Sequence, residues 1–213
     1  NHVAQRRDIH PCQARAMAAT GAKPSRTAQG VAAERVVLDA MGVIDDPYAR
    51  QMLGPSMRAI AWAVERGPAS VRTRSLTLAG LAARVRWFDA KVGDALDTGI
   101  DQVVVVGAGF DSRAWRCARD GVQFYELDHA GTQAEKIRRA PAGGPTFVEA
   151  DLTEHSPVEP LAQARLDWSR ACLFILEGLT MYLPEQVVRD RLSELAEASV
   201  TGSRLLIDFL PAR

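Results

Sequence analysis

Short apolar runs alternate with amphipathic segments from residue 100 onward, and this alternation constrains the fold more than any other feature of the sequence. The runs at residues 103–106 and 171–176 are continuously apolar, which is typical of strands covered on both faces. The predicted strands cover residues 101–106, 124–128, 146–150, 171–176 and 203–209, and the predicted helices cover residues 112–119, 130–139 and 184–200. Strands alternating with helices indicate right-handed βαβ units, so we predict an α/β fold with a mainly parallel sheet.

A mainly helical region precedes the first predicted strand. Apolar residues recur with helical spacing from Thr27 to Ala40, and residues 70–96 form a second, longer amphipathic pattern. Between them, Asp45-Asp46-Pro47 predicts the start of another helix, because proline is tolerated at the first helical position behind an aspartate cap.

Three regions are expected along the chain. They are a disordered tail at residues 1–24, a helical cap at residues 25–99, and a core at residues 100–213 that stops after the fifth predicted strand. The tail carries several arginines and the breakers Pro11 and Pro24. It lacks the apolar segment of a signal peptide.

Composition narrows the class of partner. Lysine plus arginine and aspartate plus glutamate number 26 each, so the average field favours neither nucleic acid nor an anionic membrane. No stretch has the roughly 18 apolar residues that a membrane span needs. We therefore expect a small-molecule or protein partner, with no nucleic acid and no membrane.

Cysteines and histidines show no metal-ligand spacing. The three cysteines lie far apart, and their odd number and spacing suit a reducing cytosol, so a cytoplasmic location is expected. The histidines are equally scattered, and no metal site is predicted. The residues concerned are Cys12, Cys117, Cys172, His2, His10, His129 and His155.

The first strand is followed by Gly107-Ala108-Gly109. Ligands of open parallel sheets bind beyond the carboxyl ends of the strands, and glycines there let the backbone approach a ligand closely. A nicotinamide-binding loop would have a third small residue where Ser112 stands, to hold a pyrophosphate at the helix start. Serine nearly meets that requirement, and a tight turn without a ligand is the alternative. Asp111 suits a helix cap.

Asp128 ends the second predicted strand. A carboxylate at this point can accept hydrogen bonds from two ribose hydroxyls, as in other nucleoside-binding sheets. Glu126 lies on the same strand face and could share that role. The alternative for Asp128 is a surface acid at a strand end.

Two further acidic positions follow later strands. Asp151 could accept from an adenine amino group while Leu152 packs on the ring, or Asp151 could cap the turn at Thr153-Glu154. Glu177 comes directly after an apolar strand, so we expect it to face the crevice and accept from a ligand's ammonium group. The alternative is that Glu177 pairs with an arginine.

Taken together and in order, these motifs resemble the leucine carboxyl methyltransferase family, in particular its actinobacterial branch of S-adenosylmethionine-dependent methyltransferases. The resemblance covers about residues 25 to 210. The matching segments are Ser-Arg-Thr-Ala (25–28), Asp-Asp-Pro-Tyr-Ala-Arg (45–50), Arg-Val-Arg-Trp-Phe-Asp (84–89), Gly-Ala-Gly-Phe-Asp-Ser-Arg (107–113), Glu-Leu-Asp (126–128), Asp-Leu (151–152) and Glu-Gly-Leu-Thr-Met-Tyr-Leu (177–183).

The resemblance implies a Rossmann-like, doubly wound fold and an S-adenosyl-L-methionine site. Arg84 resembles the family arginine that binds the cofactor carboxylate, a role that suits a guanidinium through a two-point contact; Arg86 is kept as an alternative. The other implied cofactor-binding residues are Gly107 and Gly109 at the methionine part, Asp128 at the ribose, Asp151 and Leu152 at the adenine, and Glu177 near the methionine end.

The implied reaction is methyl transfer to an oxygen nucleophile, on a small molecule or a peptide end. A carboxylate acceptor needs no general base, whereas a phenol or alcohol would need one. Tyr182 and His129 are the nearest candidates by placement, and we assign no catalytic residue. Two alternatives stay open: a non-catalytic, truncated cofactor-binding relic, and an NAD(P)-dependent oxidoreductase.

The family continues through two strands beyond the fifth. We therefore expect the fifth strand to form an unprotected edge. We also expect this chain to keep cofactor contacts but to turn over more poorly than a longer version.

Overall fold

The computed structural model describes residues 25–68 and 76–209. The tail expected at residues 1–24 and the start of the amphipathic region predicted at 70–96 lie outside the described residues. Among the described helices, none is long and apolar enough to cross a membrane.

Five parallel strands form one sheet in the order β3-β2-β1-β4-β5. The strands are β1 Gln102–Val106, β2 Gln123–Asp128, β3 Thr146–Glu149, β4 Cys172–Leu176 and β5 Arg204–Ile207. The chain moves outward from β1 to β3 and then crosses back to β4 on the other side of β1. The topological switch point therefore lies between β1 and β4, and the predicted doubly wound, parallel α/β fold is confirmed.

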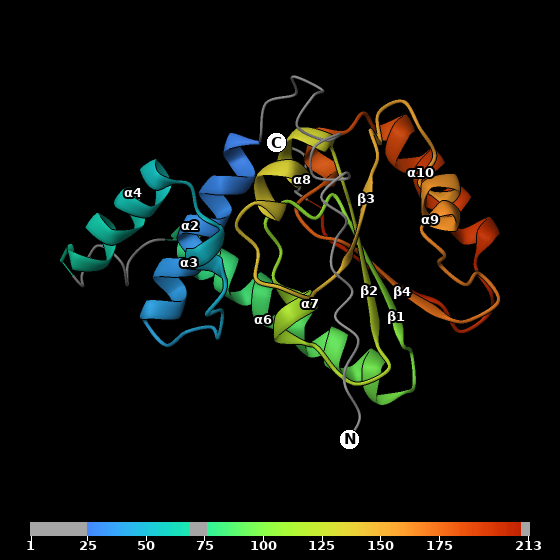
Figure 1. The fold of residues 1–213 in the computed structure, drawn as a ribbon, viewed down its shortest axis with the longest axis horizontal. Helices are drawn as coiled ribbons and strands as arrows, with labels where there is room; N and C mark the ends of the chain where they lie inside the picture. Colours follow the sequence, from blue (N-terminus) through green and yellow to red (C-terminus); the bar gives the residue numbers. More distant parts are fainter. Residues whose placement is uncertain (1–24, 69–75, 210–213) are drawn as a thin grey trace.

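The two central strands have no solvent-facing side. All five residues of β1 and all five of β4 are buried. Val104 and Val106 pack in the cluster that includes Leu161 of α9 (Val158–Gln163) and Leu195 of α10 (Glu185–Ala198). Their neighbour Val105 packs on the opposite face, against α6 (Leu76–Asp97). Figure 1 shows the result as a layered molecule, with α6 and α7 on one side of the sheet and α9 and α10 on the other.

Helix α6 belongs to the sheet layer as much as to the helical cap expected at residues 25–99. Phe88, Val92 and Ala95 are each at most 1% exposed and pack in one cluster with Val103 of β1 and Ile175 of β4. Since α6 also contacts α2 (Arg26–Ala40), it connects the amino-terminal helices to the sheet.

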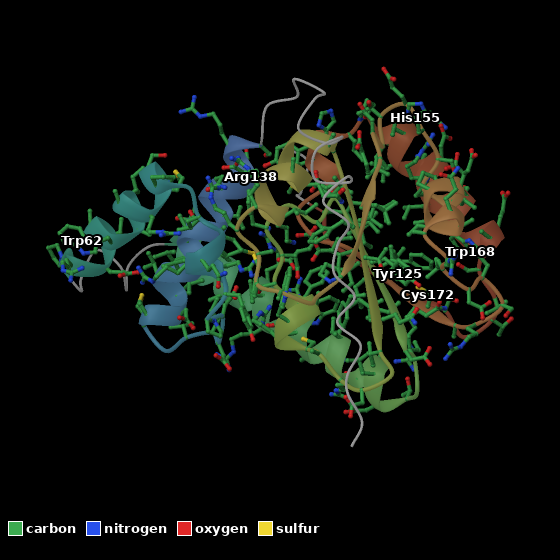
Figure 2. All side chains as sticks on the ribbon, viewed as in Figure 1. Trp62, Tyr125, Arg138, His155, Trp168 and Cys172 are labelled. Carbon is green, nitrogen blue, oxygen red and sulfur yellow. The ribbon has the colours of Figure 1, made fainter. Side chains whose placement is uncertain are left out.

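The amino-terminal helices differ from the prediction at the Asp45-Asp46-Pro47 motif. The next helix, α3 (Ala49–Met52), starts two residues after Pro47 and is a single turn. Asp46 still accepts from the Ala49 N–H at 3.2 Å, as a cap would, but its side chain is buried in an ion pair with Arg35. Helix α4 (Pro55–Arg66) follows and was not predicted. Figure 2 shows Trp62 of α4 at the outer end of the molecule, whereas Tyr125 and Cys172 lie among the core side chains.

Two predicted elements are shorter than expected. The helix predicted at 112–119 is one turn, α7 (Arg113–Arg116), which ends at the C-cap Cys117; a separate turn, closed by the Val122 N–H on the Arg119 carbonyl, follows before β2. The strand predicted to reach residue 209 ends at Ile207, and Asp208 turns its carboxylate to the loop after β4. Strand β5 is an edge of the described sheet, with Leu205 44% exposed.

Candidate ligand-binding site

A cavity of about 320 Å³ lies at the carboxyl ends of β1, β2 and β4, where the topology places the switch point. This is the size of a small ligand site. Its lining includes five of the seven predicted site residues. They are Arg84, Gly107, Gly109, Asp128 and Glu177.

The turn after β1 requires its glycines. Gly107 and Gly109 have φ angles of +67° and +51°, in the left-handed region that side chains disfavour. A Cβ on Gly107 would also lie 2.6 Å from Leu179 Cδ1, which is too close for two non-bonded carbon atoms. The bare turn thus brings the backbone to the floor of the cavity.

Asp128 joins this turn to the end of β2. Its Oδ2 accepts from the Gly109 N–H at 2.5 Å, and its Oδ1 accepts from the His129 N–H at 2.7 Å. Burial raises the pKa of the Asp128 carboxyl, while these two backbone hydrogen bonds lower it. Each oxygen keeps lone-pair capacity for a second donor from the cavity.

Glu126 does not share the role of Asp128, contrary to the expectation. Its side chain is 1% exposed, pairs with Lys136 of α8 (Ala130–Ile137), and does not line the cavity. Burial raises the pKa of Glu126 to about 7, although the Lys136 charge lowers it. The side chain of Glu126 therefore forms a buried ion pair that links β2 to α8.

Arg84 and Glu177 meet across the cavity. The Arg84 Nε lies 3.0 Å from Glu177 Oε1, so the two alternatives for Glu177, facing the crevice and pairing with an arginine, both hold. Arg84 Nη1 also lies 3.5 Å from Asp208 Oδ2. Arg86 is exposed and outside the cavity lining, which favours Arg84 of the two arginines considered.

A second arginine, Arg113, holds Glu177 from the protein side. Its Nη1 lies 2.7 Å from Glu177 Oε2 and 2.5 Å from Asp111 Oδ2, and its Nε lies 2.7 Å from Asp89 Oδ1. Burial would raise the pKa of Asp111, but the charges of Arg113 and Arg35 outweigh burial and hold it well below its usual range. The sequence analysis gave Arg113 no role; the available signal was its place two positions after Asp111, the predicted helix cap.

The cap predicted at Asp111 is displaced by one residue, because the N-cap position of α7 is occupied by Ser112, but Asp111 still accepts from the first helical N–H. Its Oδ1 accepts from the Arg113 N–H at 2.6 Å at the start of α7. Ser112 lies beside it and is completely buried. The Ser112 Oγ donates to Asp46 and accepts from Arg35 and Arg116. With its hydroxyl so engaged, Ser112 does not face the cavity, and the single-turn helix behind it is a poor cradle for a pyrophosphate.

The pair of Arg35 and Asp46 was not anticipated. Arg35 of α2 donates from Nε to Asp46 Oδ2 at 2.7 Å and from Nη1 to the Phe110 carbonyl at 3.1 Å. The amino-terminal helices are thus tied by buried charges to the glycine turn. No spacing rule pairs residues 35 and 46, and the only signal was an arginine on the apolar face of the helix.

Asp151 and Leu152 lie outside the cavity lining. Asp151 Oδ1 accepts from the backbone N–H and the hydroxyl of Thr153, at 3.0 Å and 2.5 Å, which is the turn-capping alternative. The Thr153 side-chain and backbone hydrogen bonds lower the pKa of Asp151. Leu152 is 7% exposed and packs in the core. Their adenine contacts stay a prediction.

The two residues considered as bases have different settings. Tyr182 lines the cavity and is 59% exposed. His129 is the N-cap of α8, where its Nδ1 accepts from the Gly131 N–H at 3.4 Å. Within residues 25–68 and 76–209, no group of three or more histidines, cysteines or acids is placed to hold a metal ion.

A strand-end acid beside a glycine turn is the arrangement by which open α/β sheets hold a nucleoside. The fold and the cavity therefore define the chain as a Rossmann-like α/β protein with a candidate ligand site at the switch point. Residues 26–196 match the sequence model of the leucine carboxyl methyltransferase family. The chain belongs to this family, as the motifs predicted.

Curated relatives from actinobacteria agree with this assignment, and several carry the name "Putative S-adenosyl-L-methionine-dependent methyltransferase". One from Mycobacterium avium is 34% identical over 200 residues, which cover 84% of this chain and 63% of the relative. One from Mycobacterium marinum is 31% identical over 87% of this chain and 66% of the relative. One from Mycolicibacterium paratuberculosis is 29% identical over 87% of this chain and 73% of the relative. The chain thus spans about two thirds of the length of these proteins.

A solved structure from Thermobifida fusca YX, titled as a "putative methyltransferase", covers 93% of this chain and 69% of its own. The sequence identity is 19% and the TM-score is 0.49.

Proposed function

We propose that this chain binds S-adenosyl-L-methionine in the switch-point cavity and transfers its methyl group to an oxygen of a small molecule or a peptide end. Family membership and the names of the relatives support the cofactor. The observation that carries the proposal is the meeting of Arg84 and Glu177 in the same cavity as the glycine turn and Asp128. This set has one partner each for the carboxylate, the ammonium group and the ribose of an adenosyl amino acid.

The amino-acid end of the cofactor fits the Arg84–Glu177 pair. A zwitterion offers a carboxylate to the guanidinium and an ammonium group to the glutamate. A guanidinium can meet the carboxylate at two points. Glu177 remains anchored by Arg113 at 2.7 Å when Arg84 turns to the ligand. Arg84 and Glu177, which pair with each other in this structure, would thus bind the carboxylate and the ammonium group of the ligand.

The nucleoside end fits Asp128. Its carboxylate oxygens each hold one backbone N–H and have capacity for one ribose hydroxyl each. The adenine would extend toward the loop after β3, where Asp151 and Leu152 are the proposed partners. The Gly107 and Gly109 turn between the two ends lets the ligand lie against the backbone.

Bound S-adenosyl-L-methionine supplies an electrophilic methyl group, so the protein contributes mainly position and the exclusion of water. Arg84 and Glu177 fix one end of the site, and Asp128 fixes the other. The apolar part of the lining includes Val31, Leu179 and Met181. A carboxylate acceptor is already nucleophilic, and no residue is needed to take a proton from it.

One calorimetric titration separates the three alternatives. We expect heat of binding for S-adenosyl-L-methionine and S-adenosylhomocysteine and none for reduced nicotinamide dinucleotide. Binding of the nicotinamide alone would overturn the proposal in favour of an oxidoreductase. Binding of the cofactor without methyl transfer to any acceptor would identify a non-catalytic chain.

The acceptor class is tested with cofactor labelled on the methyl group. Methyl esters of carboxylates release methanol in mild base, whereas methyl ethers do not. Label that stays on the product in base would exclude a carboxylate acceptor. Label on nitrogen or carbon would exclude both oxygen classes.

A further inference from the structure

Asp208 follows β5 and makes contacts with two separate parts of the proposed site. Its Oδ1 accepts from the Gly178 N–H at 2.7 Å, and its backbone carbonyl accepts from Thr180 Oγ1 at 2.9 Å. Its Oδ2 lies 3.5 Å from Arg84 Nη1. Sequence reasoning placed Asp208 inside a strand and gave it no function.

The first two contacts hold the loop after β4. Gly178 has a φ angle of +65°, and the peptide that Asp208 holds is the one directly after Glu177. The same loop places Leu179 against Gly107 of the glycine turn. Anchoring Gly178 and Thr180 therefore sets the position of Glu177 at one side of the cavity and of Leu179 at the other.

The third contact concerns Arg84. Its guanidinium lies between Glu177 and Asp208, whose side chains are 12% and 21% exposed. When a ligand ammonium group takes Glu177, Asp208 is the remaining acid within 4 Å of Arg84 among the described residues. Asp208 itself does not line the cavity.

We propose that Asp208 is a positioning residue for the amino-acid end of the cofactor, because it fixes the Glu177 loop through Gly178 and Thr180 and holds Arg84 at the cavity. This inference rests on the proposed function. Asp208 does not touch the ligand, so its removal should act through Arg84 and Glu177 alone. The nucleoside end, held by Asp128 on β2, should be unaffected.

Two ligands that differ only at the amino-acid end measure this effect. S-adenosylhomocysteine carries the amino-acid group, and 5′-methylthioadenosine lacks it. Asp208→Ala should weaken S-adenosylhomocysteine on the order of tenfold or more, the usual scale for a lost hydrogen bond to a charged group. The same variant should change the affinity for 5′-methylthioadenosine by less than about twofold. A general loss of structure would weaken both ligands equally.

Asp208→Asn separates the two functions of the side chain. The amide oxygen still accepts from the Gly178 N–H, but the charge that attracts Arg84 is gone. We expect slow hydrogen exchange of the Gly178 amide in this variant and fast exchange in Asp208→Ala. Asp97→Asn is the matched control, because Asp97 pairs with Arg119 on the surface and has a side chain 69% exposed.

The outcomes are distinct. A wild-type chain that binds neither adenosyl ligand overturns the proposed function and this inference with it. A wild-type chain that binds both, with an Asp208→Ala variant whose ratio of the two affinities is unchanged, overturns this inference alone. A weakening of S-adenosylhomocysteine only, absent in Asp97→Asn, supports it.

Discussion

The Arg113 guanidinium is 2.7 Å from the Glu177 carboxylate, and Arg113 itself is only 1% exposed. Its other acidic partners, Asp111 and Asp89, lie behind the glycine turn and on α6. An acid that lines the cavity is therefore held by a buried arginine shared among three elements. The position of Glu177 depends on the interior of the protein rather than on its own loop alone.

Replacing Arg113 should lower the free energy of unfolding far more than replacing an arginine on the surface. Arg113→Met leaves the buried Asp111 without its nearest cation, and breaking a buried pair typically costs about 3–5 kcal/mol. We expect a loss of that order in the free energy of unfolding by urea. Arg119→Met is the control, since the surface pair of Arg119 with Asp97 should contribute less than about 1 kcal/mol. Equal losses in the two variants would contradict the assigned role of Arg113.

A methyl group at Gly107 should disturb both backbone and packing. Gly107→Ala forces a side chain to a φ of +67° and against Leu179, and the backbone strain alone costs about 1–3 kcal/mol. Adding Leu179→Ala should restore only part of this loss, because the φ angle is unchanged. The matched control is Gly93→Ala in α6, which has open space and should stabilise the chain by about 0.5–1 kcal/mol. Differential scanning calorimetry of the three variants checks these signs.

The buried pair of Glu126 and Lys136 predicts a pH dependence of stability. Burial raises the pKa of Glu126 to about 7 in the folded protein, from its ordinary value of 4.5. The folded state thus holds a proton that the unfolded state releases between about pH 4.5 and 7. The stability linked to this group is full below pH 4.5 and is lost as pH rises through 7.

The comparison that isolates this effect uses the double variant Glu126→Gln/Lys136→Met, which removes both charges. The wild type should lose stability relative to the double variant as pH rises from 5 to 8, measured by urea unfolding at each pH. A difference between the two proteins that stays constant, or that favours the wild type at higher pH, would show that Glu126 titrates normally.

The predictable part of the fold was the part with buried, regular surfaces. The runs at β1 and β4 are continuously apolar because helices cover both faces of these strands. Such runs can be recognised in the sequence without knowing which helices cover them. Asp128 and Glu177 could be placed because the carboxyl ends of parallel strands meet at one edge. Helix α4 was not predicted, although Met57, Ile60, Ala61 and Val64 recur in it with helical spacing; of these four residues only Ala61 is buried.

Side-chain partners were the part that the sequence concealed. Glu126 and Asp128 are two positions apart and lie on the same face of β2, but only Glu126 pairs with a lysine of the following helix. Arg35 and Asp46 pair across a turn that no motif describes. Which charged side chains are buried as pairs depends on how the helices pack against the sheet, and the local sequence does not show that packing.

The central claim is that Asp128, Arg84 and Glu177 together bind one adenosyl amino acid. Its most direct test is a calorimetric titration of S-adenosylhomocysteine into the wild type, Asp128→Ala, and the surface control Asp97→Ala. We predict binding to the wild type and the control with equal affinity, and a loss on the order of tenfold or more in Asp128→Ala. Undiminished affinity in Asp128→Ala would contradict the account.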